Sequence, residues 1–193
     1  ADILLVRHVV EHAYNIDKFV EAIRLLVKPD GYILWELPSC EKSLMSGDCT
    51  MIWEEHIHYF TEFTFRQFLI NQKFYINNLS LISYPMEDCI VAITQNLTNQ
   101  KIDVDDKSEL INIEIERAKK YIELVQKNII DIPNKLSNIK KKSGKFAIFG
   151  AGHATVAFIS ILGIENLIDF IIDDNPNKIS KNLPAGNIPI IDS

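Results

Sequence analysis

The start of the chain alternates between short apolar runs and one amphipathic segment. Residues 3–6 (ILLV) and 32–38 (YILWELP) are apolar runs of strand length, rich in branched and aromatic side chains. Between them, apolar side chains recur at helical spacing up to Val27, with Asp17 as the expected N-cap and KPDG as the end signal. A strand, a helix and a strand at this spacing predict a βαβ unit, and hence two parallel strands buried on both faces.

The middle of the chain predicts an antiparallel edge and then a long helix. We expect a loop over 39–50, a helix near 64–72, and two strands over 74–85 and 89–96 that pair antiparallel across a short turn. Residues 105–130 carry apolar side chains along one helical face, which predicts a long amphipathic helix. The sheet is therefore expected to be mixed.

The last part of the chain has the pattern of a separate α/β block. Pro133 should end or kink the long helix, and the lysine-rich stretch 140–145 (KKKSGK) is interpreted as a solvated linker at a domain boundary. Residues 145–176 then show the order strand, glycine-rich turn, helix and strand, which is typical of a Rossmann-like domain. The predicted fold class is α/β, with a partial mixed sheet at 1–98, a helical connector at 99–143 and a Rossmann-like domain, expected to be truncated, at 144–193.

Composition narrows the classes of partner and compartment. The 193 residues carry a net charge of −6, which argues against nucleic acid and anionic membranes as partners. Three cysteines without a CxxC pair indicate reduced thiols, and neither a disulfide framework nor a zinc knuckle is expected. No apolar run reaches the roughly 18 residues of a membrane span and no leader is recognised, so a cytoplasmic location is expected. The apolar start without Met predicts a fragment of a longer protein, and the oligomeric state is left open.

Acids and imidazoles gather where the first two predicted strands end. His8, Glu11 and His12 follow directly on the first strand, and Glu36 lies near the end of the second. The carboxyl ends of parallel strands meet at one edge of a sheet, where ligands collect. We therefore expect these four side chains to converge there.

The stretch MIWEEHIHYF, residues 51–60, mixes acids, imidazoles and aromatic rings in a way that suits neither a core strand nor a solvated loop. If it folds back over the same sheet edge, its aromatic rings line a cleft while Glu55 and His56 face the reactants. We expect His12 and His56 to share that cleft. The remaining histidines are more simply interpreted as structural: His8, His58 and His153.

The segment HVVEH, residues 8–12, also matches H-x-x-E-H, an inverted zinc-protease motif. That motif needs a helix that places both histidines on one face. Here a strand runs into His8, and the next helix begins only near Asp17. No metal site is therefore predicted.

A glycine-rich turn at the start of the C-terminal block supports an alternative function. Residues 150–155 (GAGHAT) nearly match G-x-G-x-x-G, with Thr155 at the place of the last glycine. Gly150 and Gly152 would let backbone amides approach a phosphate, and Asp173 lies where a dinucleotide fold keeps its ribose acid. The alternative is a nucleotide- or dinucleotide-binding module of the sugar-modifying or oxidoreductase type. A Rossmann-like domain with an empty or repurposed crevice is the simpler interpretation.

Two long stretches resemble known methyltransferases. Residues 2–38, from DILLVRHVVEH to GYILWELP, resemble the fourth strand, the following helix and the fifth strand of class I S-adenosylmethionine-dependent methyltransferases. Residues 52–69 (IWEEHIHYFTEFTFRQFL), with the block that begins FAIFGAGHAT (146–155), resemble the second half of the sugar C-methyltransferase family, whose members carry a Rossmann-like C-terminal domain. The resemblance implies a partial class I methyltransferase sheet, S-adenosylmethionine as cofactor, and C-methylation of a nucleotide-linked keto sugar or a related acceptor.

The resemblance also implies roles for particular residues. The glutamate-histidine pair of the family's motif falls on Glu55 and His56: His56 would remove the proton beside the ketone, and Glu55 would orient it. The family's histidine after the fourth strand falls on His12, which would hold the substrate or the enolate oxygen. Trp53 stands at the place of a family tyrosine and brings no hydroxyl group to the acceptor.

Further residues are assigned by their position. Glu36 and Tyr59, with Trp53, are assigned to substrate binding, and His8 and Glu11 to the part of the methyl-donor floor that the chain retains. The family's glycine loop and ribose acid for the donor, and its zinc domain, are not found in this sequence. We therefore expect this chain alone to bind the donor weakly or not at all.

Overall fold

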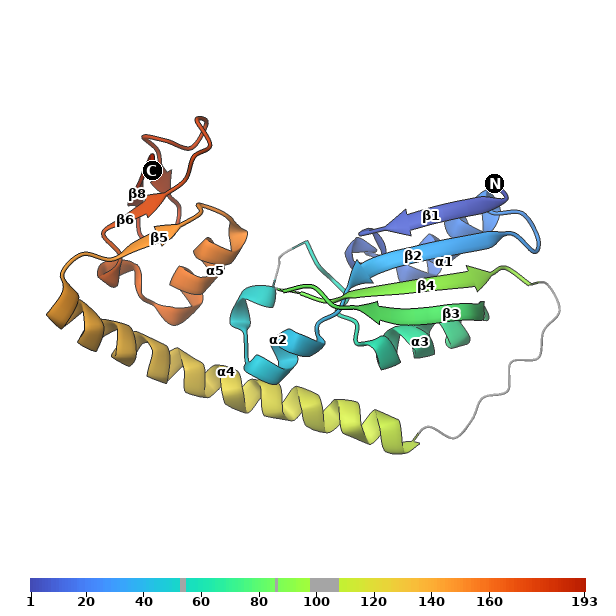
Figure 1. The fold of residues 1–193 in the computed structure, drawn as a ribbon. Coiled ribbons are helices and arrows are strands. Elements are labelled where there is room, and N and C mark those ends of the chain that lie inside the picture. Colours follow the sequence, from blue (N-terminus) through green and yellow to red (C-terminus); the bar gives the residue numbers. More distant parts are fainter. Residues whose placement is uncertain (53–54, 86, 98–107) are drawn as a thin grey trace. The chain divides into compact units, whose positions relative to one another are not determined.

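The structure of the chain, a computed structural model, describes all residues except 53–54, 86 and 98–107 (Figure 1). It contains two compact units. The first unit comprises Ala1–Met45 and Glu54–Arg117, and the second comprises Ser46–Trp53 and Ala118–Ser193. The division of the sequence into a sheet domain, a connector and a C-terminal domain stays a prediction.

The first unit is built on a four-stranded mixed sheet with the strand order β1-β2-β4-β3 (Figure 1). β1 (Ile3–Arg7) and β2 (Tyr32–Pro38) are parallel. β4 (Cys89–Gln95) runs antiparallel to both β2 and β3 (Tyr75–Ile82). The predicted parallel pair and the predicted antiparallel edge are thereby confirmed. The carboxyl ends of β1 and β2 lie at one edge of the sheet, as parallel pairing requires.

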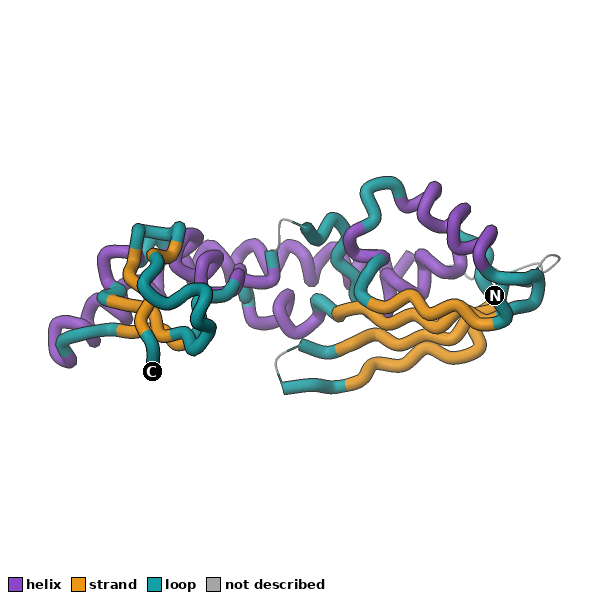
Figure 2. The backbone as a smooth tube through the Cα atoms, turned by 90° about the horizontal axis from the view of Figure 1, so that it is seen from above, coloured by secondary structure: helices purple, strands orange, loops and turns teal. Residues whose placement is uncertain are grey.

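Helices cover one face of this sheet (Figure 2). α1 (Ile16–Leu26) and α3 (Glu62–Asn71) contribute buried side chains to the same core as Trp35 of β2, which is fully buried. Ile3 and Leu5 of β1 are instead 64% and 67% exposed. The prediction that this strand is buried on both faces is therefore wrong, because no described helix of the unit covers the second face.

An aromatic cluster holds the core of the first unit together. The ring of Trp35 lies edge-on to the rings of Phe65, Phe68 and Phe74, with centroids 5.9, 6.3 and 5.6 Å away. Its Nε1 atom donates a hydrogen bond of 2.9 Å to the hydroxyl oxygen of Thr94. The indole is therefore buried without leaving its polar atom unsatisfied, as aromatic side chains with a polar atom require.

Both covering helices begin at capping side chains. The side chain of Asn15 accepts a hydrogen bond of 3.0 Å from the amide of Lys18 and caps α1, whereas the predicted cap, Asp17, lies in the first turn. Thr61 and Thr64 form a reciprocal capping box at the start of α3. These bonds satisfy amides that a helix start leaves without partners.

Two short helices lie in the predicted loop over 39–50. They are α2 (Glu41–Ser46) and the 3₁₀ turn η2 (Cys49–Met51), which Asp48 caps by accepting a 2.8 Å hydrogen bond from the amide of Thr50. The loop prediction is wrong here because helices this short show no apolar period in the sequence.

The long helix extends further than predicted. α4 (Ser108–Ser143) runs through Pro133, which neither ends it nor marks a boundary. A proline inside a helix removes one backbone donor. Its neighbours Ile132 and Leu136 pack into the core of the second unit, and such tertiary packing stabilises a helix more than local propensity does.

The lysine run is part of this helix and not a linker, so the prediction for 140–145 is wrong over its first residues. Lys140 to Lys142 lie in the last turn of α4, where positive charge complements the helix C-terminus. The Nζ atom of Lys140 donates to the carboxylate of Asp169 at 2.9 Å and to the carbonyl oxygen of Leu167 at 2.6 Å. The lysine therefore anchors the helix end to the block that follows.

The second unit holds another four-stranded sheet, with the order β5-β6-β8-β7. Three of its strands are parallel, and β7 runs antiparallel to β8. Ile159, Ile164 and Ile171 form the centre of its core, each at most 1% exposed. The predicted order of strand, turn, helix and strand is thereby confirmed as α/β. The elements are β5 (Ala147–Phe149), α5 (His153–Leu162), η3 (Glu165–Leu167), β6 (Phe170–Ile172), β7 (Asn182–Leu183) and β8 (Ile188–Ile191).

Candidate functional site

The carboxyl ends of β1 and β2 bring an arginine, a histidine and a glutamate together. Arg7 and Glu36 are register partners and form an ion pair, with Nε to Oε2 at 2.9 Å. His8 leaves the strand with φ at 50°, its Nε2 atom 3.4 Å from Oε1 of Glu36. The hydrogen bond from Arg7 lowers the pKa of Glu36 below its ordinary value, so this carboxyl stays ionised. The convergence of His8 and Glu36 is observed, and a substrate contact of Glu36 stays a prediction.

Glu11 lies in the 3₁₀ turn η1 (Val10–His12), and it is the most enclosed group of the site. The residue is only 1% exposed, and neither carboxylate oxygen has a hydrogen-bond partner among the described residues. Its Oε1 atom lies 3.5 Å from Nδ1 of His8 and 3.9 Å from Nε2 of His12. A buried carboxylate without hydrogen bonds is costly unless positive charge faces it, and the two imidazoles are the groups that can supply that charge.

The stretch that follows residue 54 folds back onto η1. The amides of Ile57 and His58 both donate to the carbonyl oxygen of Glu11, at 2.8 and 3.1 Å. In return, the Nδ1 atom of His12 donates to the carbonyl oxygen of Glu55 at 2.9 Å. This set of bonds places the acids and imidazoles of two distant segments side by side, as we expected from the mixed composition of residues 51–60.

His56 meets His12 at the centre of this arrangement. Their ring centroids are 4.7 Å apart with the planes at 75°, and the ring of Tyr59 follows at 6.1 Å from that of His56. Burial, and then the positive charge of His12, lower the pKa of His56 below its ordinary value of 6.5. His56 is therefore neutral near pH 7, which is the state that accepts a proton.

Other members of the stretch have different surroundings. Glu55 is exposed, and its contact with His12 uses the backbone carbonyl. The ring of His58 donates from Nε2 to the carbonyl oxygen of Ala13 at 2.9 Å, which is a structural contact. Phe60 packs 5.3 Å from Phe65 in the core and does not line the cluster. Trp53, which was assigned to the substrate, lies outside the described residues.

Among the described residues, two groups of side chains could hold a metal ion. In each, the possible ligand atoms lie within 4.8 Å of one another. One group comprises Glu11, His12 and His56, and the other His8, Glu36 and Cys89. Burial raises the pKa of the Cys89 thiol, which disfavours the thiolate that a metal needs.

The glycine-rich turn of the second unit is closed by its own chain. Oδ2 of Asp173 accepts a hydrogen bond of 2.7 Å from the amide of Ala151, and Nζ of Lys178 donates to the same oxygen at 3.0 Å. Oδ1 of Asp173 accepts from the amide of Asn175 at 2.9 Å. These hydrogen bonds lower the pKa of Asp173. The acid that we assigned to a ribose therefore holds the turn itself.

His153, at the first position of α5, also has a structural contact: its Nε2 atom donates to the carbonyl oxygen of Ile52 at 3.1 Å. Gly150 has φ at 98°, a conformation that favours glycine. A Cβ atom at Gly150 or Gly152 would meet nothing within 4 Å. Gly150 permits the turn, and no close approach of a described atom requires glycine at either position.

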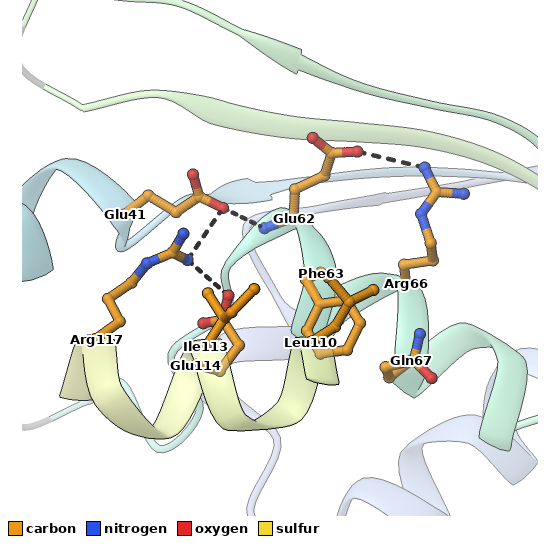
Figure 3. Close-up of a pocket in the computed structure, with 9 residues that line it drawn as sticks. All are labelled: Glu41, Glu62, Phe63, Arg66, Gln67, Leu110, Ile113, Glu114 and Arg117. Atoms are coloured by element: carbon orange, nitrogen blue, oxygen red, sulfur yellow. Dashed lines mark hydrogen bonds and ion pairs between the residues drawn. The ribbon is translucent and has the colours of Figure 1, made fainter. Parts of the chain in front are cut away.

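A pocket of about 380 Å³ lies among α2, α3 and the start of α4 (Figure 3). Both of its arginines are paired: Arg66 with Glu62 at 3.3 Å, and Arg117 with Glu114 at 2.7 Å. It shares no residue with the histidine cluster. The sequence did not point to it, since its lining comes from three separate helices. The lining residues are Glu41, Glu62, Phe63, Arg66, Gln67, Leu110, Ile113, Glu114 and Arg117.

Comparison with known proteins adds a class to this geometry. Residues 99–193 match the family model of a C-methyltransferase C-terminal domain, which supports a methyltransferase enzyme. The matched part of the chain is therefore similar to the C-terminal domain of C-methyltransferases. No curated protein matches the chain. No described helix is both long and apolar enough to cross a membrane.

Proposed function

We propose that the first unit carries the acceptor side of an S-adenosylmethionine-dependent C-methyltransferase, and that His56 is its general base. The acceptor is a carbon beside a ketone, on a nucleotide-linked keto sugar or a related molecule. One observation carries the proposal: His56 lies 4.7 Å from His12 at the carboxyl edge of the sheet, with a lowered pKa. The family match and the resemblance of residues 52–69 support the same chemistry.

The proton step follows from the two imidazoles. Neutral His56 takes the proton from the carbon beside the ketone, and the electron pair left behind moves to the ketone oxygen as an enolate. Nδ1 of His12 already donates its proton to the carbonyl oxygen of Glu55. His12 can therefore donate a hydrogen bond to the enolate oxygen only if Nε2 carries a second proton. Oε1 of Glu11 lies 3.9 Å from that atom. In the doubly protonated form, His12 would stabilise the enolate through Nε2.

S-adenosylmethionine supplies the electrophilic methyl group when it is bound. Glu11 and His8, the two residues assigned to the donor floor, face the imidazole cluster, and Glu11 is buried. We propose no contact between Glu11 and the donor. The proposed proton abstraction from the acceptor can be tested without the methyl donor.

Deuterium exchange isolates the proton step. The chain is incubated in D₂O with a nucleotide-linked 4-keto sugar, and mass spectrometry measures deuterium at the carbon beside the ketone. We expect exchange above the buffer rate, and a fall of about 10²- to 10⁴-fold in His56→Gln, the usual worth of a positioned base. His153→Gln is the matched control in the second unit. Equal exchange by wild type and His56→Gln would overturn the assignment.

A further inference from the structure

The buried carboxylate of Glu11 calls for a cation. Both oxygens are buried without a hydrogen bond from the described residues, and the side chain is 2% exposed. An uncompensated buried charge is among the costliest features of a folded protein. A positive species in contact with these oxygens would remove that cost.

The tautomer of His12 sharpens this requirement. A carbonyl oxygen only accepts hydrogen bonds, so the 2.9 Å contact between Glu55 O and Nδ1 of His12 means that Nδ1 carries the proton. In the neutral ring, the lone pair of Nε2 then lies 3.9 Å from Oε1 of Glu11. A lone pair and a carboxylate at this distance repel each other unless a proton or a metal ion lies between them.

His56 completes a three-ligand set. One ring nitrogen of His56, one of His12 and a carboxylate oxygen of Glu11 all lie within 4.8 Å of one another. We propose that Glu11, His12 and His56 form a binding site for a divalent transition-metal ion of the zinc type. Two imidazoles and one carboxylate are a ligand set that zinc and its neighbours accept, with positions left for water or substrate.

The geometry requires only a small closure. Ligand atoms around a tetrahedral zinc ion lie roughly 3.3 Å from one another, since each is about 2.0–2.2 Å from the metal. The atoms of this cluster, which lie within 4.8 Å of one another, must therefore approach by up to about 1.5 Å. The bond from His12 to Glu55 is the backbone support that ligating histidines usually have on their second nitrogen.

The site differs from the H-x-x-E-H pattern that residues 8–12 suggested. That pattern would pair His8 with His12 on a helix, whereas the structure has a short 3₁₀ turn there and replaces His8 with the distant His56. The other candidate group, His8, Glu36 and Cys89, is a weaker metal site because the carboxylate of Glu36 already pairs with Arg7 at 2.9 Å.

This inference goes beyond the proposed function. A metal ion on His56 would occupy the lone pair that accepts the substrate proton. Zinc and the α-proton would then compete for one nitrogen atom, and the metal-bound form would be inactive in proton transfer. The metal site is tested by binding, which does not depend on exchange or methyl transfer.

Metal-free chain is titrated with Zn²⁺ in competition with a chromophoric chelator, and with Co²⁺ as a visible-absorption probe. We expect one equivalent of Zn²⁺ to bind and tetrahedral Co²⁺ bands to appear. Glu11→Gln and His56→Gln should each weaken Zn²⁺ binding by about 10-fold or more. Cys89→Ser is the matched control and should bind as wild type does.

Two results would overturn the proposal. One is wild-type chain that takes no Zn²⁺ from the chelator. The other is loss of binding in Cys89→Ser with retention in both Glu11→Gln and His56→Gln, which would assign the ion to His8, Glu36 and Cys89. Circular dichroism of each variant separates lost binding from lost folding, and the two test variants remove ligands from different segments.

Discussion

The imidazole of His12 is tied to the backbone of Glu55 by a hydrogen bond of 2.9 Å from Nδ1 to the carbonyl oxygen. This bond fixes the proton of the neutral ring on Nδ1 and turns Nε2 toward Glu11. Glu55 therefore contacts His12 through its main chain, and its carboxylate acts on His56 as a nearby charge. The resemblance to sugar C-methyltransferases had implied a role for its carboxylate.

Under the proposed function, His56→Ala should reduce methyl transfer by about 10²- to 10⁴-fold, because it removes the proposed general base. Glu55→Gln should stay near wild type, since the substitution keeps the carbonyl that holds His12. Steady-state rates of both variants at saturating donor are the measurement. A loss in Glu55→Gln as large as in His56→Ala would show that the carboxylate itself orients the base.

The stability of the first unit should depend on pH through His56. Burial and the charge of His12 lower the pKa of His56 in the folded state below 6.5, so the unfolded chain binds the proton more readily. The contribution of His56 is therefore fully present above about pH 6.5 and is lost as pH falls through the lowered folded pKa. Urea unfolding between about pH 7.5 and pH 5 measures this fall.

The control for that measurement is His56→Gln, because Glu11, His8, His12 and Glu55 also titrate or carry charge beside His56. Between about pH 7.5 and pH 5, the free energy of unfolding of His56→Gln should fall less than that of wild type. An identical fall in both proteins would assign the pH dependence to another group.

NADH should leave the thermal midpoint of the chain unchanged. The amide of Ala151, which a phosphate would need, already donates to Asp173 at 2.7 Å. A genuine site at 100 times its dissociation constant would add about 2.7 kcal/mol to the free energy of unfolding. Differential scanning fluorimetry over increasing NADH concentration tests this. A midpoint that rises with concentration would restore the dinucleotide-binding alternative.

Gly47→Ala should destabilise the second unit by about 2 kcal/mol or more, through left-handed strain and overpacking. Gly47 has φ at 68°, and a Cβ atom there would lie 2.5 Å from Cβ of Leu124. Gly152→Ala is the matched control, with no atom within 4 Å of the added Cβ. Because Gly152 is the N-cap of α5, Gly152→Ala should lower the free energy of unfolding by less than about 1 kcal/mol. Urea unfolding measures the free energy of unfolding of both variants. An equal decrease in Gly47→Ala and Gly152→Ala would contradict the steric argument.

The sheet of the first unit was predictable because its signals are local. The apolar runs at 3–6 and 32–38, with one amphipathic segment between them, specify a parallel pair whatever surrounds them. The extent of α4 was not predictable in this way. Pro133 is a strong local stop signal, and only packing of Ile132 and Leu136 in the second unit explains why the helix continues.

The sequence predicted which segments meet at the candidate site, but it predicted the roles of the individual side chains less well. Chain order places His12 after β1, and the mixed composition of residues 51–60 indicated a return to the same edge. The amides of Ile57 and His58 bond to the carbonyl oxygen of Glu11 from far along the chain, and the Glu11 side chain is buried beside them. Sequence patterns carry no information about such contacts, so Glu55 was favoured over Glu11.

The turn at Gly150 has a consequence for how such loops change over evolution. The negative charge at this turn comes from the carboxylate of Asp173, a side chain of the same polypeptide. This carboxylate accepts a hydrogen bond from the Ala151 amide and pairs with Lys178 at 3.0 Å. Removing that side chain, as in Asp173→Ala, would leave an amide and an ammonium group open to anions from solvent. The carboxylate of Asp173 therefore takes the hydrogen bond from the Ala151 amide that a phosphate would need. Domains of this shape can gain or lose nucleotide affinity without any change of fold.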